Sequence, residues 1–173
     1  MIYAQSAAAY PFTPVKIVFL TGLSNPWSCA LSDIQRTFMS SLDFPESWKV
    51  YRNFPWTDGE ERSPLPPLWK ASFHNGWQFL LASTPFFRRI AQPHWNAMLR
   101  TTEHLLVITG SCGLQIANCL QTGQPSSAPR VDLLGIGPVA WRRPKSNCRL
   151  VQGKRDYLSR FLLRKVEDRL AGL

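Results

Sequence analysis

The sequence predicts an α/β fold with a mainly parallel sheet and helices on both of its faces. Two short apolar runs, residues 16–20 and 105–109, are typical of buried strands, because they are rich in Val, Ile and Leu and bounded by turn residues. Stretches in which apolar residues recur every three to four positions follow these runs, which is the spacing of one helix face. Strands that alternate with helices in this way build parallel sheets covered on both sides.

The first elements follow from the order of these patterns. Residues 16–20 predict a first strand that stops at Thr21-Gly22. A helix ending near residue 41 is expected after the Ser24-Asn25-Pro26 turn, because one face collects the apolar residues Trp27, Leu31, Ile34, Phe38 and Leu42. Residues 48–54 predict a second strand, which ends at Pro55 and a polar turn.

Residues 60–100 are expected to be a lid or a helical insertion. Residues 60–68 contain three prolines, which predict an ordered loop. Residues 69–100 are rich in aromatic side chains and should form two helical pieces, because Pro85 and Pro93 do not fit comfortably inside one helix. These helices would cover the sheet or close over a site, and an aromatic lid would favour an apolar acyl group.

The remaining elements complete one domain that spans residues 1–173. The strand at 105–109 is followed by helical spacing at 114–120, and strands are expected at 131–136 and 149–151. Residues 157–170 predict a closing amphipathic helix. A chain of this length buries most of its core without disulfides or a structural metal.

Composition limits the class of protein. The four cysteines lack the paired spacings of a zinc site and are expected to be reduced thiols, and the aspartates form no metal-ligand cluster, so neither a metal nor a cofactor is expected. There is no secretory signal and no apolar run long enough for a transmembrane segment, which predicts a soluble, cytoplasmic protein. The net charge of +9 is concentrated from residue 130 onward, as a solvated basic face or as a surface for an anionic partner.

The most informative motif is Thr109-Gly110-Ser111-Cys112-Gly113, between a predicted strand and a predicted helix. A nucleophile elbow places a serine at such a sharp turn and needs small flanking residues, because the backbone is strained and neighbouring chains approach closely. The positive end of the following helix would favour an oxyanion there. Ser111 is therefore the candidate nucleophile.

These residues resemble the α/β-hydrolase family, over about residues 16–56 and 104–160. Ile17-Val18-Phe19-Leu20-Thr21-Gly22-Leu23 is similar to its first core strand and oxyanion loop, with Thr21 in place of the common histidine and Thr109 in place of the usual first glycine of the elbow. The resemblance implies that the amides of Leu23 and Cys112 bind the oxyanion. It also implies that Asp156 is the triad acid.

The triad histidine is missing from its usual place. The family order of serine, acid and histidine puts the base after Asp156, but residues 157–173 contain no histidine. His104 would lie at the wrong end of its strand, roughly 20 Å from the serine. His74 and His94 lie in the aromatic segment, and His74, beside Asn75-Gly76, is the better candidate base; a surface or core-edge histidine is the alternative for each.

Two further motifs have alternative interpretations. Cys112 would become the nucleophile if the motif were shifted by one residue, because a helix N-terminus lowers a thiol pKa; a small buried cysteine is the alternative. Gly135-Ile136-Gly137 is too short for a dinucleotide-binding fingerprint and is expected to end a strand.

Three functional hypotheses remain open at this point. The first is a hydrolase or acyltransferase acting on a small ester or thioester substrate, with Ser111, Asp156 and an unusual base. The second is a non-catalytic protein that keeps the hydrolase-like core as a binding or interaction module. The third is a shortened hydrolase whose open sheet edge would be covered by a partner strand or by homo-oligomerisation.

Overall fold

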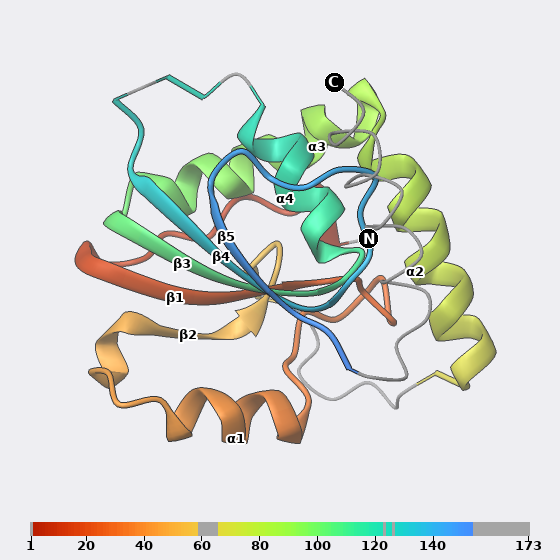
Figure 1. The fold of residues 1–173 in the computed structure, drawn as a ribbon, viewed down its shortest axis with the longest axis horizontal. Coiled ribbons are helices and arrows are strands. Elements are labelled where there is room, and N and C mark those ends of the chain that lie inside the picture. Colours follow the sequence, from red (N-terminus) through yellow and green to blue (C-terminus); the bar gives the residue numbers. More distant parts are fainter. Residues whose placement is uncertain (1, 59–65, 123, 126, 154–173) are drawn as a thin grey trace.

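The computed structural model describes residues 2–58, 66–122, 124–125 and 127–153. A parallel sheet of five strands, in the order β2-β1-β3-β4-β5, forms its centre (Figure 1). The strands are β1 (Thr13–Thr21), β2 (Lys49–Asn53), β3 (Thr102–Ser111), β4 (Arg130–Pro138) and β5 (Asn147–Val151). This confirms an α/β fold with a parallel sheet.

Helices lie on both faces of the sheet. Helix α1 (Asp33–Ser41) covers one face with Met39, which packs against Ile17 and Phe19 of β1. Helices α3 (Pro85–Leu99) and α4 (Gly113–Gln121) cover the other face and build the larger core, to which α3 contributes Trp95 and Met98. The alternation of Ile17 and Val18 between the two cores is the period-two pattern of a strand buried on both faces.

Two local expectations are corrected. Helix α1 begins at Asp33 rather than directly after the Ser24-Asn25-Pro26 turn, because Ser32 and Gln35 form a reciprocal capping box there. Pro93 does lie inside a helix, since α3 continues through it. The residues around Pro93 are buried in the core, and this burial offsets the lost backbone hydrogen bond. The expected division into two helical pieces is confirmed, and Pro85 is the first residue of the second.

Helix α2 (Leu68–Ala82) differs from the others in its position. It lies beside the carboxyl ends of the strands rather than flat on the sheet (Figure 1). Among its described side chains only Gln78 and Ala82 are buried. The segment expected to be a lid or insertion therefore divides into α3, which covers the sheet, and α2, which covers the edge where the loops after the strands gather.

The expected helix at 157–170 and the candidate acid Asp156 lie outside the described residues. Within the described part of the chain, no helix is both long and apolar enough to span a bilayer.

Candidate active site

The turn between β3 and α4 carries Ser111 in an unusual backbone conformation. Ser111 is exposed and has a φ of 51°, in the left-handed region that residues other than glycine rarely adopt. The carbonyl of Ser111 accepts a hydrogen bond of 2.8 Å from the amide of Val139, which fixes the turn. Cys112 is the N-cap of α4, so the first amides of this helix lie next to the serine.

Close packing of the turn against β1 explains its small residues. A side chain at Gly113 would place its Cβ 1.8 Å from the carbonyl oxygen of Leu20, so only glycine fits. In the sheet register Thr21 is opposite Gly110, and a Cβ on Gly110 would lie 3.0 Å from the Thr21 Cγ2. The loop after β1 is therefore a direct neighbour of the serine turn.

Two amide side chains hold this loop. Asn53, at the end of β2, accepts a hydrogen bond of 2.8 Å from the Thr21 amide and donates one of 3.3 Å to the Thr21 carbonyl. Gln78 of α2 accepts a buried hydrogen bond of 2.7 Å from the Leu23 amide. The Leu23 amide, which the hydrolase resemblance makes an oxyanion donor, is thus already occupied by a carbonyl oxygen of the protein itself.

The polar side of α2 makes two more contacts with the same region. The His74 Nδ1 lies 2.8 Å from the Ser24 carbonyl oxygen. Asn75 lies against the elbow, because a Cβ on Gly22 would meet its Oδ1 at 2.4 Å and the Cys112 Sγ at 2.6 Å. The Asn75 Oδ1 is buried and has no hydrogen-bond partner among the described residues. Helix α2 therefore closes over the candidate oxyanion site with polar groups.

The three histidines have different surroundings. A carbonyl only accepts, so the His74 Nδ1 carries the ring proton in the neutral form, and its Nε2 is left with a lone pair. His94 is buried in α3 beside the Tyr3 carbonyl, and burial lowers its pKa. His104 pairs with Asp132 at 2.9 Å, at the far end of β3 from Ser111. His74 is thus the histidine whose helix packs against the candidate site.

Cys112 is placed poorly for a nucleophile. Its side chain is buried, and burial raises the pKa of the thiol to about 12. The helix N-terminus next to it does not outweigh this desolvation. Since the thiolate is the reactive form, the structure favours the exposed Ser111 over Cys112.

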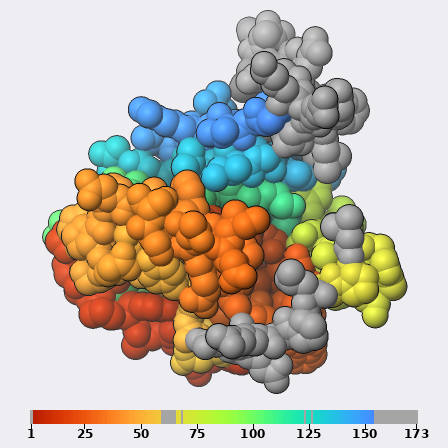
Figure 2. Space-filling view, turned by 90° about the horizontal axis from the view of Figure 1, so that it is seen from below, coloured from red at the N-terminus to blue at the C-terminus, as the bar shows by residue number. Residues whose placement is uncertain are grey.

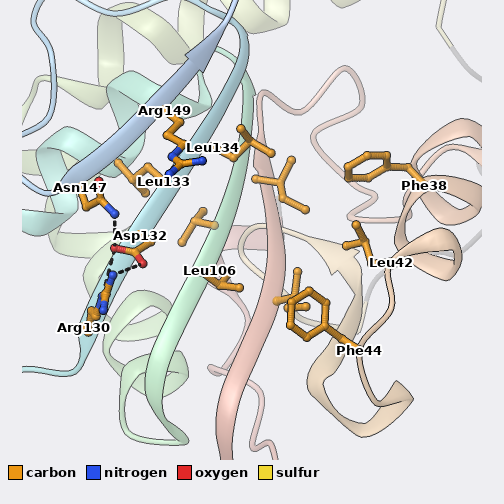
Figure 3. Close-up of a pocket in the computed structure, with 13 residues that line it drawn as sticks. Phe38, Leu42, Phe44, Leu106, Arg130, Asp132, Leu133, Leu134, Asn147 and Arg149 are labelled. Carbon is orange, nitrogen blue, oxygen red and sulfur yellow. Dashed lines mark hydrogen bonds and ion pairs between the residues drawn. The ribbon is translucent and has the colours of Figure 1, made fainter.

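Among the hollows on the described part of the molecule, two bear on the site. The smaller, of about 410 Å³, borders the loop after β1 and is lined by Thr21, Gly22, Leu23 and Asn53, among others. The larger, of about 460 Å³, is an apolar groove between α1 and strands β3 to β5 (Figure 3), on a part of the sheet that α1 leaves uncovered (Figure 2). Ser111 lines neither hollow. The smaller hollow shares Thr21, Gly22 and Leu23 with the loop beside the serine turn, so we place the candidate active site at the strand ends.

A polar cluster centred on Asp132 borders the larger groove. Its carboxylate accepts hydrogen bonds from Arg130 and Asn147 (Figure 3). It also accepts one from His104. Burial alone would raise the pKa of Asp132, but these donors and the charge of Arg130 hold it below its usual value. Arg149 extends from β5 at the same groove. This cluster ties the amino ends of the strands together.

The structure brings some of the predicted site residues together and leaves others apart. Ser111, Cys112, Thr21 and Leu23 meet where β1 and β3 end, whereas His74 contacts the loop and has no hydrogen bond to the serine turn. Asn53 and Gln78 were not predicted. For Gln78 a signal exists, because His74, Asn75 and Gln78 share one side of a helix whose other side is aromatic. The described residues contain no group of three metal-ligating side chains.

Comparison of the chain with protein-family models, with curated proteins and with solved structures gives no match. No family is assigned by similarity.

Proposed function

We propose that the protein is a serine hydrolase or acyltransferase of the α/β-hydrolase type, acting on an ester or thioester. The observation that carries the proposal is Ser111 itself, an exposed serine with a φ of 51° at a strand-to-helix turn. Strained backbone at an exposed nucleophilic side chain is typical of active sites. The neighbouring strand ends support it, because the resemblance requires the oxyanion loop to lie beside the elbow.

In the proposed reaction, the Ser111 Oγ attacks the carbonyl carbon of the substrate and its proton passes to the His74 Nε2. The negative charge that develops on the carbonyl oxygen is stabilised by the amides of Cys112 and Leu23. The proton then moves to the leaving group, which departs and leaves an acyl group on Ser111. Water or another acceptor finally removes this acyl group, and the serine recovers its proton.

Two features of this mechanism require movement of α2. Gln78 must release the Leu23 amide before an oxyanion can use it, and His74 must turn toward the serine. The Ser24 carbonyl would orient the His74 ring, a role that a carboxylate fills in the usual triad. Asp156, the acid implied by the resemblance, remains the other proposed partner of the base and lies outside the described residues.

A fluorophosphonate probe tests the proposal directly. We expect it to label the wild-type protein and Cys112→Ala, and to leave Ser111→Ala unlabelled. His74→Gln should slow labelling by about 10²- to 10⁴-fold, the usual contribution of a general base, whereas His104→Gln should not slow it. Labelling of Ser111→Ala at the wild-type rate would refute the nucleophile, and labelling of His74→Gln at that rate would refute the base.

The second candidate function is a non-catalytic binding module. It is favoured by the Gln78 side chain on the Leu23 amide, since a site without catalysis has no need of a free oxyanion donor. Complete absence of labelling, both in the wild type and after removal of the Gln78 side chain, would favour this alternative.

A further inference from the structure

Helix α2 presents a row of large apolar side chains to solvent, while its inner side combines polar contacts with the packing of Phe79, Leu81 and Ala82 against the core. Its large exposed side chains are Trp69 (68% exposed), Phe73 (68%), Trp77 (55%) and Leu80 (57%). At 100° per residue these four positions fall within a sector of about 80° on the helix. His74, Asn75 and Gln78 lie on the other half and contact the loop after β1. An ordinary surface helix has the reverse arrangement.

Two further exposed aromatic side chains lie outside α2. Phe86, in the first turn of α3, is 67% exposed. Trp141, in the loop after β4, is exposed as well, and its ring packs against Phe79 of α2 with 4.8 Å between the ring centroids. Figure 2 shows α2, in yellow, projecting from the side of the molecule. An extended apolar surface of this kind marks an interaction site.

Basic side chains surround this surface. Lys70 lies over the Trp69 ring, with its Nζ 5.3 Å from the ring centroid. Arg142 follows Trp141, whose ring packs against Phe79 of α2, and Arg88 lies near the start of α3, which begins shortly after α2 ends. No aspartate or glutamate occurs between Glu61 and Glu103, nor in α4 or the 139–146 loop. Within the described part of the chain, the neighbours of the aromatic surface are therefore neutral or basic.

From this combination we propose that the outer side of α2 docks on an anionic lipid membrane, with the helix lying in the plane of the interface. Trp, Phe and Leu side chains insert at the boundary between headgroups and acyl chains. Lys and Arg side chains beside them bind the lipid phosphates and are attracted by the negative surface potential. A second copy of the chain fits less well, because two such surfaces would bring their basic residues together.

The proposal does not depend on Ser111 being a nucleophile, since it rests on the outer side of α2 alone. Its test is co-sedimentation of the full chain with vesicles of phosphatidylcholine and phosphatidylserine, and with vesicles of phosphatidylcholine only. We expect clear binding to the anionic vesicles and at least tenfold weaker binding to the neutral ones. Absence of binding to anionic vesicles, or equal binding to both, would overturn the proposal.

Variants assign the binding to α2. Combined Trp69→Ser, Phe73→Ser and Trp77→Ser replacements should weaken binding at least about tenfold, because each aromatic side chain contributes burial in the interface. Ile34→Ser on α1, where the side chain is 84% exposed, is the matched control and should bind like the wild type. Unchanged binding by the triple variant would assign the interaction to another basic part of the chain and overturn the proposal.

Two more measurements separate charge and self-association. Lys70→Gln and Arg142→Gln should each weaken binding to anionic vesicles about fivefold, the effect of one basic residue near such a surface, and leave binding to neutral vesicles unchanged. Equal loss on both vesicles would contradict the charge contribution. Dimerisation of the wild type that the triple variant abolishes, without vesicle binding, would assign the surface to a second copy and overturn the membrane proposal.

Discussion

Replacement of Gln78 by alanine tests whether α2 blocks the oxyanion site. The Gln78 Oε1 accepts the Leu23 amide at 2.7 Å in a buried environment, and no other acceptor for this amide is present among the described residues. If the amide serves the reaction, the glutamine competes with the substrate oxygen for it. Gln78→Ala should therefore accelerate the reaction of Ser111 with a fluorophosphonate probe.

The magnitude follows from the hydrogen bond that is removed. Separating a buried donor from its acceptor costs about 1–3 kcal/mol. The wild type must break this hydrogen bond before an oxyanion can bind the Leu23 amide, whereas Gln78→Ala need not. Labelling of the variant should therefore be faster by about 5- to 150-fold. The folded protein should at the same time lose about 1–3 kcal/mol of unfolding free energy, because the Leu23 amide is left without its partner.

Gln78→Ala should therefore be labelled faster than the wild type although it is less stable, which separates the two effects. Labelling rates are measured with a gel-based fluorescent probe, and unfolding free energies with urea. Gln92→Ala, which removes a glutamine side chain that donates to the Leu120 carbonyl in α4, is the control for simple loss of a hydrogen bond. It should lower stability and leave labelling unchanged. A Gln78→Ala protein that remains folded but is labelled more slowly than the wild type would show that Gln78 supports the loop rather than blocking it.

Four other substitutions and one chemical modification test the geometry. Gly113→Ala should destabilise the protein by about 3 kcal/mol or more in urea unfolding, since its Cβ would lie 1.8 Å from a β1 carbonyl oxygen. Gly76→Ala is the control, because its Cβ would meet nothing within 4 Å, and it should stabilise α2 by about 0.5–1 kcal/mol. Equal effects of the two substitutions would contradict the packing. The Asp132 carboxylate contributes to the free energy of unfolding above its unfolded pKa of about 3.9, and this contribution is lost as the pH falls through its lower folded pKa. Asp132→Asn should therefore lower the stability at pH 7 and flatten the acid side of the stability curve. Iodoacetamide at pH 8 should modify Cys112 only after unfolding, because burial raises its pKa to about 12; rapid modification of the folded protein would contradict this. Ser111→Gly should be as stable as the wild type or more stable by up to about 1 kcal/mol, since relief of about 1–2 kcal/mol of left-handed strain exceeds the added unfolded-state entropy; a loss of stability would argue against the strain.

The sequence patterns predicted the sheet well because buried parallel strands have a strong signal. The apolar runs at 16–20 and 105–109 became β1 and β3, two inner strands whose residues face a core on each side. The strand-to-helix turn at Ser111 was also predicted, since two glycines close to one serine leave few other interpretations. Pro93 misled the prediction, because local backbone preference carries no information on the buried contacts of α3.

The polar side of α2 could not be predicted from the patterns used. Composition and aromatic content placed a lid over residues 60–100, but aromatic side chains are normally expected to face the protein. Here they face solvent, and the contacts with the site come from His74, Asn75 and Gln78 instead. Nothing local in the sequence specifies which side of a helix meets the core, because that choice depends on what the opposing surface offers, in this case an amide and a carbonyl of the loop after β1.

The way α2 is held bears on the choice between an enzyme and a binding module. The four large apolar side chains on the outer side of α2 are exposed, whereas Phe79, Leu81 and Ala82 pack against or lie in the core. A movement that frees Gln78 and keeps these three side chains in place would sacrifice little hydrophobic burial. Its contact with the candidate oxyanion donor is the Gln78 hydrogen bond to the Leu23 amide, which water or a substrate can replace. A surface that binds the aromatic side of α2 therefore needs to supply only a few kcal/mol to draw Gln78 from the Leu23 amide. A module without catalysis would gain nothing from so weakly held a cover, nor from a serine at a φ of 51° where glycine would be less strained. The weakly held helix and the strained serine both favour an active site that opens when α2 moves.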